Sequence, residues 1–407
     1  MPQASDERDG PHGPAIRHPH TVSIIACAGY EPEKVVAAVE QAVDLLGGIS
    51  RFVPAGSQVL LKPNMLQGLP PERAVATHPE VVRAVALLLT RAGASVTLAD
   101  SPGAGIRYVP GNLRKAYDIS GYSRVADELG FHLNLSTGYS ERPFPDGKVI
   151  KQFPIIDPAT SADRIVSVSK AKTHILTLLT GATKNLFGLV PGLEKPIFHA
   201  RFQEQERFAD MLLDLHAHVR PHLHIVDGVL GMEGDGPTGG NPRQVGVILA
   251  GTNAVAVDHV LCRVLGIEPL DVPVIRAAVA RGWLDEHGDD ITLLGDPLEL
   301  VRVTDFKKPS TYMGEGKGIR ERRLVLALYR LGKVYALRPR VILPRCIRCG
   351  KCSAICPAGA ITIGEKGAVI DRSRCIRCYC CHEMCSEEAI VLERGIAGKV
   401  LQKILRI

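Results

Sequence analysis

Short apolar segments alternate with longer amphipathic ones through the first three quarters of the chain. A short, continuously apolar run is typical of a buried strand, whereas apolar residues at every third or fourth position indicate a helix. Strands are predicted at residues 21–26, 58–61, 95–99, 131–135, 164–168, 223–226 and 245–250. Helices are predicted at residues 33–46, 78–92, 204–219, 254–265 and 272–281. Apolar strands that alternate with helices predict a mostly parallel, doubly wound α/β sheet, whose strand order the pattern leaves open.

The last quarter of the chain carries two cysteine runs that share the spacing C-x2-C-x2-C-x3-C. The first run is Cys346, Cys349, Cys352 and Cys356, and the second is Cys375, Cys378, Cys381 and Cys385. Three thiolates within seven residues can wrap one iron–sulfur cubane on a tight loop. Zinc sites usually combine two CxxC pairs, which leaves the third closely spaced cysteine of each run unexplained. The spacing therefore favours iron–sulfur clusters over zinc or disulfides.

Residues 342–393 resemble bacterial two-cluster ferredoxins, in which the fourth cysteine of each run ligates the other run's cluster. The resemblance implies two [4Fe-4S] clusters, one held by Cys346, Cys349, Cys352 and Cys385, the other by Cys375, Cys378, Cys381 and Cys356. Apolar stretches at 360–363, 368–370 and 389–392 predict the small strands of such an α+β module. Ser386 departs from the proline that often follows the fourth cysteine. Cys380 is an extra thiol, expected to be a spectator, although an alternative ligand role stays open.

Composition and charge limit the remaining choices. A chain of 407 residues suggests two or three domains, and nine of its eleven cysteines lie in the cluster module, which fits a reducing cytoplasm. No apolar run approaches the length of a membrane span, and residues 1–20 lack the apolar core of a signal peptide. The net charge of +6 is mild for this length, so no nucleic-acid partner is expected.

Five segments follow from these patterns. They are a disordered tail at 1–20, an α/β domain at 21–305, a basic linker at 306–341, the ferredoxin domain at 342–393 and an amphipathic tail at 394–407. Residues 317–345 hold nine Lys or Arg against one Glu around an apolar stretch. This segment is predicted to pack as a linker helix, and docking of an acidic redox partner or a membrane surface is the alternative.

Polar side chains follow four of the predicted strands. Open α/β sheets bind ligands outside the carboxyl ends of their strands, so these side chains are expected to share one pocket. The Thr180–Gly188 segment adds a further lysine soon afterwards. The predicted pocket residues are Lys62, Asp100, Lys172, His174, Lys184 and Asp227. The alternative is that each strand end is polar merely because it meets solvent.

This set of residues suggests a chemistry. The lysines Lys62, Lys170, Lys172 and Lys184 suit an anionic small molecule, and His174 is the natural proton donor near neutral pH. Asp100, Asp227 and Glu233 are expected to orient the lysines or to bind a metal. Neither a G-x-x-x-x-G-K-[ST] loop nor a strand–G-x-G-x-x-G–helix unit occurs, so nothing favours ATP or NAD.

Several short motifs of the first 290 residues recur together in one family. They are Lys62-Pro63-Asn64, His78-Pro79-Glu80, Asp100–Gly103, Lys170–His174, Thr180–Gly188, Asp227-Gly228, Met232–Pro237 and Ala256–Asp258. On these motifs residues 21–290 resemble the family catalogued as domain of unknown function 362. Some members carry a fused ferredoxin module, as this chain does. The resemblance implies an iron–sulfur redox protein in general and no settled reaction.

The sequence therefore predicts an iron–sulfur oxidoreductase that reduces an anionic small molecule. Electrons are expected from an external carrier of the ferredoxin or flavodoxin type, relayed through the two clusters. Five basic residues crowd the cysteine loops and predict a potential less negative than that of an acidic ferredoxin; they are Arg348, Lys351, Arg372, Arg374 and Arg377. Two alternatives stay open. The chain is an electron-transfer protein whose α/β domain is only a docking module, or it is a ligand-binding redox sensor or cofactor-assembly protein.

Overall fold

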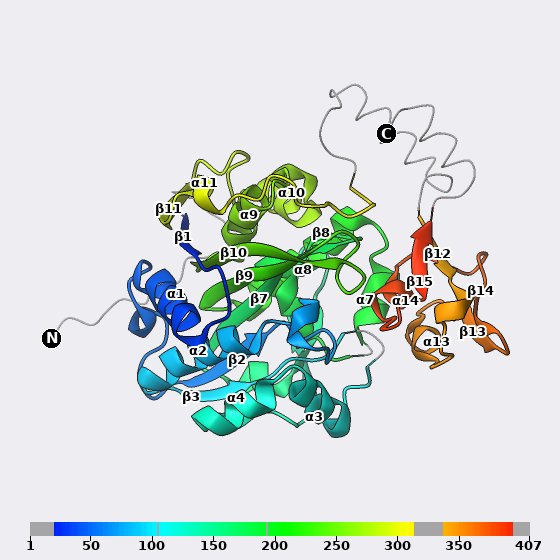
Figure 1. The fold of residues 1–407 in the computed structure, drawn as a ribbon, viewed down its shortest axis with the longest axis horizontal. Coiled ribbons are helices and arrows are strands. Elements are labelled where there is room, and N and C mark those ends of the chain that lie inside the picture. Colours follow the sequence, from blue (N-terminus) through cyan, green and yellow to red (C-terminus); the bar gives the residue numbers. More distant parts are fainter. Residues whose placement is uncertain (1–19, 104–105, 193, 313–336, 394–407) are drawn as a thin grey trace.

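The computed structural model describes residues 20–103, 106–192, 194–312 and 337–393 (Figure 1). The predicted tails at 1–19 and 394–407 and most of the predicted basic linker, 313–336, lie outside the described residues. Figure 1 shows a large α/β part and, beside it, a small part that carries the cysteine runs.

A nine-stranded sheet organises the described residues of the α/β part. Its strands are β1 (His20–Ala26), β2 (Gln58–Pro63), β3 (Ser95–Leu98), β4 (His132–Leu133), β7 (Arg164–His174), β8 (Leu178–Leu179), β9 (Leu223–Glu233), β10 (Asn241–Gly251) and β11 (Ile291–Gly295). The order is β11-β1-β10-β9-β7-β2-β3-β4, with β8 paired to β7 off this path. The neighbours from β9 to β4 pair in parallel, as do β1 and β11, while β10 runs antiparallel to both of its neighbours. The predicted mostly parallel α/β sheet is confirmed.

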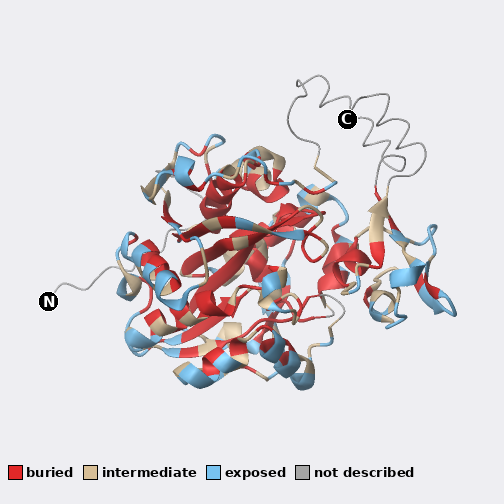
Figure 2. Cartoon of the chain, in the orientation of Figure 1, coloured by how far each residue is buried: buried red, intermediate tan, exposed pale blue. Residues whose placement is uncertain are grey.

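Helices cover both faces of this sheet (Figure 1). One face packs against α1 (Pro32–Asp44), α2 (Pro79–Arg91), α3 (Pro110–Ile119) and α4 (Tyr122–Leu129), and the other against α8 (Gln205–Val219), α9 (Ala254–Val264) and α10 (Pro273–Ala280). Successive side chains of a strand point to opposite faces. On β2, Val59 and Leu61 therefore enter the first core and Leu60 the second. Figure 2 shows that this central sheet is largely buried.

Two central strands are longer than the sequence predicts. The apolar pattern ends at residues 168 and 226, but β7 continues to His174 and β9 to Glu233. Polar residues normally mark the end of a buried strand because an unpaired charge is costly to bury. Here Lys170 and Asp227 lie opposite each other in the β7–β9 pairing and neutralise one another, so the strands continue.

Shorter elements complete the α/β part. They are the hairpin of β5 (Tyr139–Pro143) and β6 (Gln152–Ile156), and the helices α5 (Asp157–Ser161), α6 (Gly181–Asn185), α7 (Glu194–Arg201) and α11 (Leu298–Val301). Helices α6 and α7 lie in the region between 157 and 200 whose elements the sequence pattern does not resolve. Both border the carboxyl edge of β7.

The cysteine module contains two small antiparallel sheets and two short helices. Strand β12 (Arg338–Val341) pairs with β15 (Ile390–Glu393), and β13 (Ile361–Gly364) pairs with β14 (Gly367–Ile370). The helices are α13 (Lys351–Ile355) and α14 (Cys380–Glu383). Strand β12 precedes residue 342, where the sequence places the start of the module.

The module packs against the α/β part through α14. The carbonyl of Glu383 accepts hydrogen bonds from the Gln67 side chain at 2.9 Å and from the Thr238 hydroxyl at 2.7 Å. Arg73 forms an ion pair with Glu388 at 2.6 Å. In Figure 1 α14 lies next to α7, at the carboxyl edge of the sheet. None of the helices in the described ranges is both long and apolar enough to span a bilayer.

Candidate functional site

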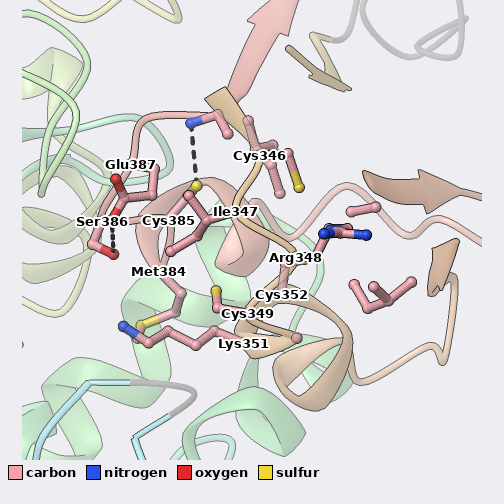
Figure 3. A pocket seen from close by; sticks show the side chains of 15 residues that line it. Cys346, Ile347, Arg348, Cys349, Lys351, Cys352, Met384, Cys385, Ser386 and Glu387 are labelled. Carbon is pink, nitrogen blue, oxygen red and sulfur yellow. Dashed lines mark hydrogen bonds between the residues drawn. The ribbon is translucent and has the colours of Figure 1, made fainter. Parts of the chain in front are cut away.

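The eight cysteines of the two runs surround two cavities. Cys346, Cys349, Cys352 and Cys385 line the first cavity, which Figure 3 shows from close by. Cys356, Cys375, Cys378 and Cys381 line the second. The fourth cysteine of each run thus lies at the other run's cavity. These are the same two sets that the resemblance to two-cluster ferredoxins implies.

At each cavity a backbone N–H donates to one cysteine sulfur. The sulfur of Cys356 accepts a hydrogen bond from the Ala360 N–H at 3.2 Å, and that of Cys385 accepts one from Ala389 at 3.2 Å. Such bonds stabilise thiolates and tune cluster potentials. All eleven cysteines are free thiols.

Cys380 is buried, and it packs with Ile355 and Met384 while also bordering the second cavity. Its thiol lies 3.9 Å from the Cys378 carbonyl oxygen. The spectator role of Cys380 stays a prediction.

A separate cavity, here called the lysine pocket, opens at the carboxyl ends of β2, β3 and β7. Its lining combines segments far apart in the chain: Asn64, Leu66, Asp100, Ser101, Gly103, Lys172, Thr180, Lys184, Asn185, Phe187, Gly188, Lys195, His199, Pro237 and Glu383. Three of the six predicted pocket residues, Asp100, Lys172 and Lys184, are in this wall. Glu383 comes from α14, so the cysteine module forms part of the same pocket.

Lys62 lies behind the pocket wall as the partner of Asp100. Its ammonium group is 2.9 Å from Asp100 Oδ1 and 3.2 Å from Asn185 Oδ1, and its side chain is fully buried. Burial lowers the pKa of Lys62, and the Asp100 carboxylate opposes that shift. A Cβ atom on Gly188 would lie 2.0 Å from Asp100 Oδ1 and 2.6 Å from Lys62 Nζ. Only glycine leaves room for this ion pair, which explains the glycine that ends the Thr180–Gly188 motif.

The three lysines of the pocket wall lack sufficient negative partners. Lys172 donates to the Val75 carbonyl at 2.6 Å, and burial followed by the charge of Lys184 holds its pKa well below the ordinary value. Lys195 donates to the carbonyls of Ser101 and Pro102, and burial lowers its pKa to about 7. Burial also lowers the pKa of Lys184, and the charge of Glu383 opposes that shift. An anionic ligand would supply the missing charge.

Four buried polar atoms of the pocket wall also lack hydrogen-bond partners within the described part of the chain. They are Asn64 Oδ1, Thr180 Oγ1, His199 Nδ1 and Glu383 Oε1. A buried polar atom without a partner costs about 1–3 kcal/mol. Four such atoms around one cavity point to a polar ligand that satisfies them.

His174 lies beside the pocket, in a role different from the predicted one. Its Nδ1 accepts hydrogen bonds from the N–H groups of Leu176 at 3.0 Å and Thr177 at 3.4 Å, so the neutral ring carries its proton on Nε2. Burial first, and then the charge of Lys184, hold the pKa of His174 well below its ordinary value. The imidazole is therefore neutral at pH 7, which contradicts a proton donor that titrates near neutrality. Its Nε2 lies 3.3 Å from Glu383 Oε1.

Asp227 does not lie in the lysine pocket, and this prediction is wrong. Because β9 continues to Glu233, Asp227 sits within the sheet rather than at its edge. Its carboxylate is 2.7 Å from Lys170 Nζ and accepts from the Tyr30 hydroxyl at 2.9 Å and the His78 N–H at 2.8 Å. Asp227 does orient Lys170, as expected, whereas Glu233 accepts from the Lys307 N–H at 3.0 Å and contacts none of the predicted lysines.

Asp258 positions the segment that carries Lys184. Its carboxylate accepts from the N–H groups of Ala182 and Thr183 at the start of α6. Gly181 has φ +53°, and a Cβ atom there would lie 2.0 Å from Asp258 Oδ1. Burial raises the pKa of Asp258 to about 6. The Ala256–Asp258 motif therefore acts on the pocket by holding α6.

Sequence reasoning missed Lys195, His199 and Glu383 as pocket residues. Lys195 and His199 lie on α7, in a region without a clear period, and Glu383 looks like a spacer between two cysteines. No local signal in the sequence distinguishes them, because packing alone brings them to the edge of the sheet.

Residues 59–263 match the family model described as "Domain of unknown function (DUF362)". The chain belongs to this family. Residues 345–389 match the 4Fe-4S dicluster domain, so the C-terminal part of this DUF362 protein is an iron–sulfur cluster-binding module of the ferredoxin type, as its cysteine spacing predicts.

Two further proteins are similar to this DUF362 chain. The "Thylakoid-associated protein sll1697" of Synechocystis sp. (strain ATCC 27184 / PCC 6803 / Kazusa) is 34% identical over 295 residues, which cover 72% of this chain and 89% of that protein. The lactate racemase apoprotein from Thermoanaerobacterium thermosaccharolyticum superposes with a TM-score of 0.39 at 11% identity. That superposition covers 62% of this chain and 59% of the racemase chain.

Gly188→Ala tests the packing of the Lys62–Asp100 pair. The added Cβ must displace a buried carboxylate, so we expect a loss of about 2 kcal/mol or more in the free energy of unfolding, measured by chemical denaturation. Gly111→Ala is the matched control, because nothing lies within 4 Å of a Cβ atom there on helix α3. Equal stabilities of the two variants would contradict the close approach.

Proposed function

We propose that this protein is an iron–sulfur reductase that passes electrons from an external carrier, through two [4Fe-4S] clusters, to an anionic small molecule in the lysine pocket. The position of Glu383 is the main support for this proposal. This residue lies on α14 between cluster cysteines Cys381 and Cys385, and it also lines the pocket with Lys172 and Lys184. A ligand in the pocket therefore sits next to the electron-transfer module.

The crossed cysteine sets support two clusters. When bound, such clusters accept and release single electrons. One would be held by Cys346, Cys349, Cys352 and Cys385, and the other by Cys375, Cys378, Cys381 and Cys356. The division into an α/β domain at 21–305, a linker and a ferredoxin domain from 342 belongs to the same proposal.

The charges of the pocket support an anionic substrate. The wall holds Lys172, Lys184 and Lys195, and Lys62 lies behind it, while the carboxylates are Asp100 and Glu383. Asp100 is already neutralised by Lys62 at 2.9 Å. Burying an uncompensated charge is costly, so an anion that binds here recovers energy from several lysines at once. His174 is neutral, and its Nε2 lies 3.3 Å from Glu383 Oε1 without a hydrogen bond between them.

The cysteines also indicate the cellular compartment in which the protein acts. We infer a reducing compartment, such as the cytoplasm, because eleven free thiols include eight that clusters require. The relative from Synechocystis is described as thylakoid-associated. A membrane-associated site of action on the reducing side is compatible with both observations.

The metal content tests the cluster assignment. Protein purified without oxygen should hold about eight iron and eight sulfide per chain, as two [4Fe-4S] clusters require. Because ligation is crossed, Cys356→Ser should damage the cluster of the second run and Cys385→Ser that of the first. Iron analysis and low-temperature EPR distinguish the two. Cys380→Ser is the control that should leave both clusters intact, and zinc in place of iron would rule the assignment out.

Sulfate binding tests the pocket through its pH dependence. Sulfate keeps its charge between pH 6 and pH 9, whereas Lys195, with a pKa of about 7, loses its proton in that range. The anion binds the protonated lysine, so affinity measured by calorimetry should fall as pH rises from 6 to 9. Lys195→Met should bind more weakly at pH 6 and show a flatter profile. An unchanged profile in this variant would show that sulfate binds elsewhere.

Reoxidation of the clusters tests the reductase activity. Protein reduced with dithionite and freed of excess reductant should lose its reduced-cluster EPR signal when mixed anaerobically with a desalted, anion-enriched metabolite fraction. Lys184→Met should retain iron content and reduction by dithionite but reoxidise at least about tenfold more slowly, since one charged contact contributes about 1.5–3 kcal/mol. Lys34→Met, on exposed α1, is the matched control. Equal reoxidation by Lys184→Met would remove the pocket from the reaction.

A further inference from the structure

The two cysteine runs contain the same tetrapeptide in two different environments. Cys346-Ile347-Arg348-Cys349 and Cys375-Ile376-Arg377-Cys378 are identical in sequence. Arg348 and Arg377 even share the same left-handed backbone, with φ of +58° in both. Differences in exposure between the two loops therefore come from what packs against each of them.

The second loop is covered by protein. Cys378 and Ile106, which belongs to the α/β part, pack against the same small apolar cluster of Ile355, Cys380 and Met384. Ile376 and Arg377 are half-buried. This copy of the tetrapeptide faces the domain that holds the lysine pocket.

The first loop faces solvent. Ile347 is 63% exposed, and Cys349 is the one exposed cysteine of the eleven. Ile347, Cys349 and Ile363, which is 39% exposed, all border the first cysteine cavity. A large apolar side chain beside an exposed cluster ligand is the arrangement expected where another protein covers the loop.

Basic side chains surround this exposed loop. Arg345, Arg348, Lys351 and Lys366 are exposed there, against the exposed carboxylates of Glu365 and Glu387. Figure 3 shows Arg348 and Lys351 close to the cavity. The excess of positive charge favours an acidic partner surface.

We propose that the surface around Ile347, Cys349 and Lys351 is the docking site for a one-electron carrier protein with an acidic face around its redox group, such as a flavodoxin. This inference rests on the proposed function and adds the point of electron entry. Cys346, Cys349, Cys352 and Cys385 would hold the cluster that takes one electron from the carrier, which would be oxidised as this cluster is reduced. Cys356, Cys375, Cys378 and Cys381 would hold the cluster that receives the electron next. Cys349 is the exposed ligand of the first set, so the carrier would approach the cluster there.

Stopped-flow mixing of the full-length, anaerobic protein with fully reduced flavodoxin tests this docking site. Arg345→Glu/Lys351→Glu should lower the second-order rate constant of cluster reduction about tenfold at low ionic strength, within the range that electrostatic steering supplies. The difference should vanish at high salt because screening removes steering. Ile347→Ser should weaken binding of oxidised flavodoxin, measured by calorimetry, by about tenfold, because it removes a central apolar contact.

The matched controls are the same kinds of substitution, placed on the α/β part instead of the cysteine module. Lys34→Glu/Lys115→Glu reverses two exposed charges on α1 and α3, and Leu300→Ser removes an apolar side chain that is 74% exposed on α11. These controls should behave as the wild-type protein does. Every variant should keep its iron content and its rate of reduction by methyl viologen radical, which needs no protein docking.

Two results would overturn the docking site. In the first, the loop variants accept electrons from flavodoxin as fast as the controls at every salt concentration. In the second, they lose binding to vesicles of anionic phospholipid while the flavodoxin rate is unchanged, which would make the face a membrane contact. Failure of dithionite to reduce the clusters would instead refute the proposed function, so the two failures are distinguishable.

Discussion

The site depends on the cost of burying lysine ammonium groups at the carboxyl edge of a parallel sheet. Two of these lysines are neutralised within the domain, Lys62 by Asp100 at 2.9 Å and Lys170 by Asp227 at 2.7 Å. Removing one partner of a buried ion pair costs about 3–5 kcal/mol, so these two pairs hold β2 to the segment after β3 and β7 to β9. Among the described residues, the lysines of the pocket wall form no comparable ion pair. The fold thus neutralises two buried lysines and gathers three others around one cavity.

The cysteine module completes this cavity. Glu383 reaches the pocket from α14, while its carbonyl is held by Gln67 and Thr238 of the α/β part. Because α14 contains Cys381 and ends two residues before Cys385, a shift of this helix would affect both the pocket and the cysteine sets. Binding of an anion and the charge of the clusters are therefore expected to influence each other. Such reciprocity is a thermodynamic necessity when two sites interact.

Much of the fold and part of the site could be predicted from the sequence. The strands of the central sheet are apolar on both faces, which makes their pattern clear. The short loops explain why the first three cysteines of each run share a cavity, whereas the crossed fourth cysteine was implied by the resemblance to two-cluster ferredoxins. The ends of β7 and β9 could not be predicted, since Lys170 and Asp227 look like surface residues until their pairing is known. Lys195 and Glu383 could not be predicted as pocket residues for another reason. The hydrogen-bond partners of Lys195, Ser101 and Pro102, are 94 and 93 positions away in the sequence. Glu383 belongs to the cysteine module, and only tertiary packing brings it to the other residues of the pocket wall.

The central claim is that the lysine pocket and the clusters are electrostatically connected, and a redox titration with and without saturating sulfate tests it most directly. A reduced cluster carries more negative charge, so an anion in the pocket should make reduction harder. The midpoint potential of at least one cluster should become more negative, by about 59 mV for each tenfold loss of sulfate affinity on reduction. Lys184→Met should abolish this sulfate-induced shift of the midpoint potential. The potentials of the variant can still be measured in the absence of sulfate. Tight binding of sulfate to the wild-type pocket with no change in either potential would contradict the account.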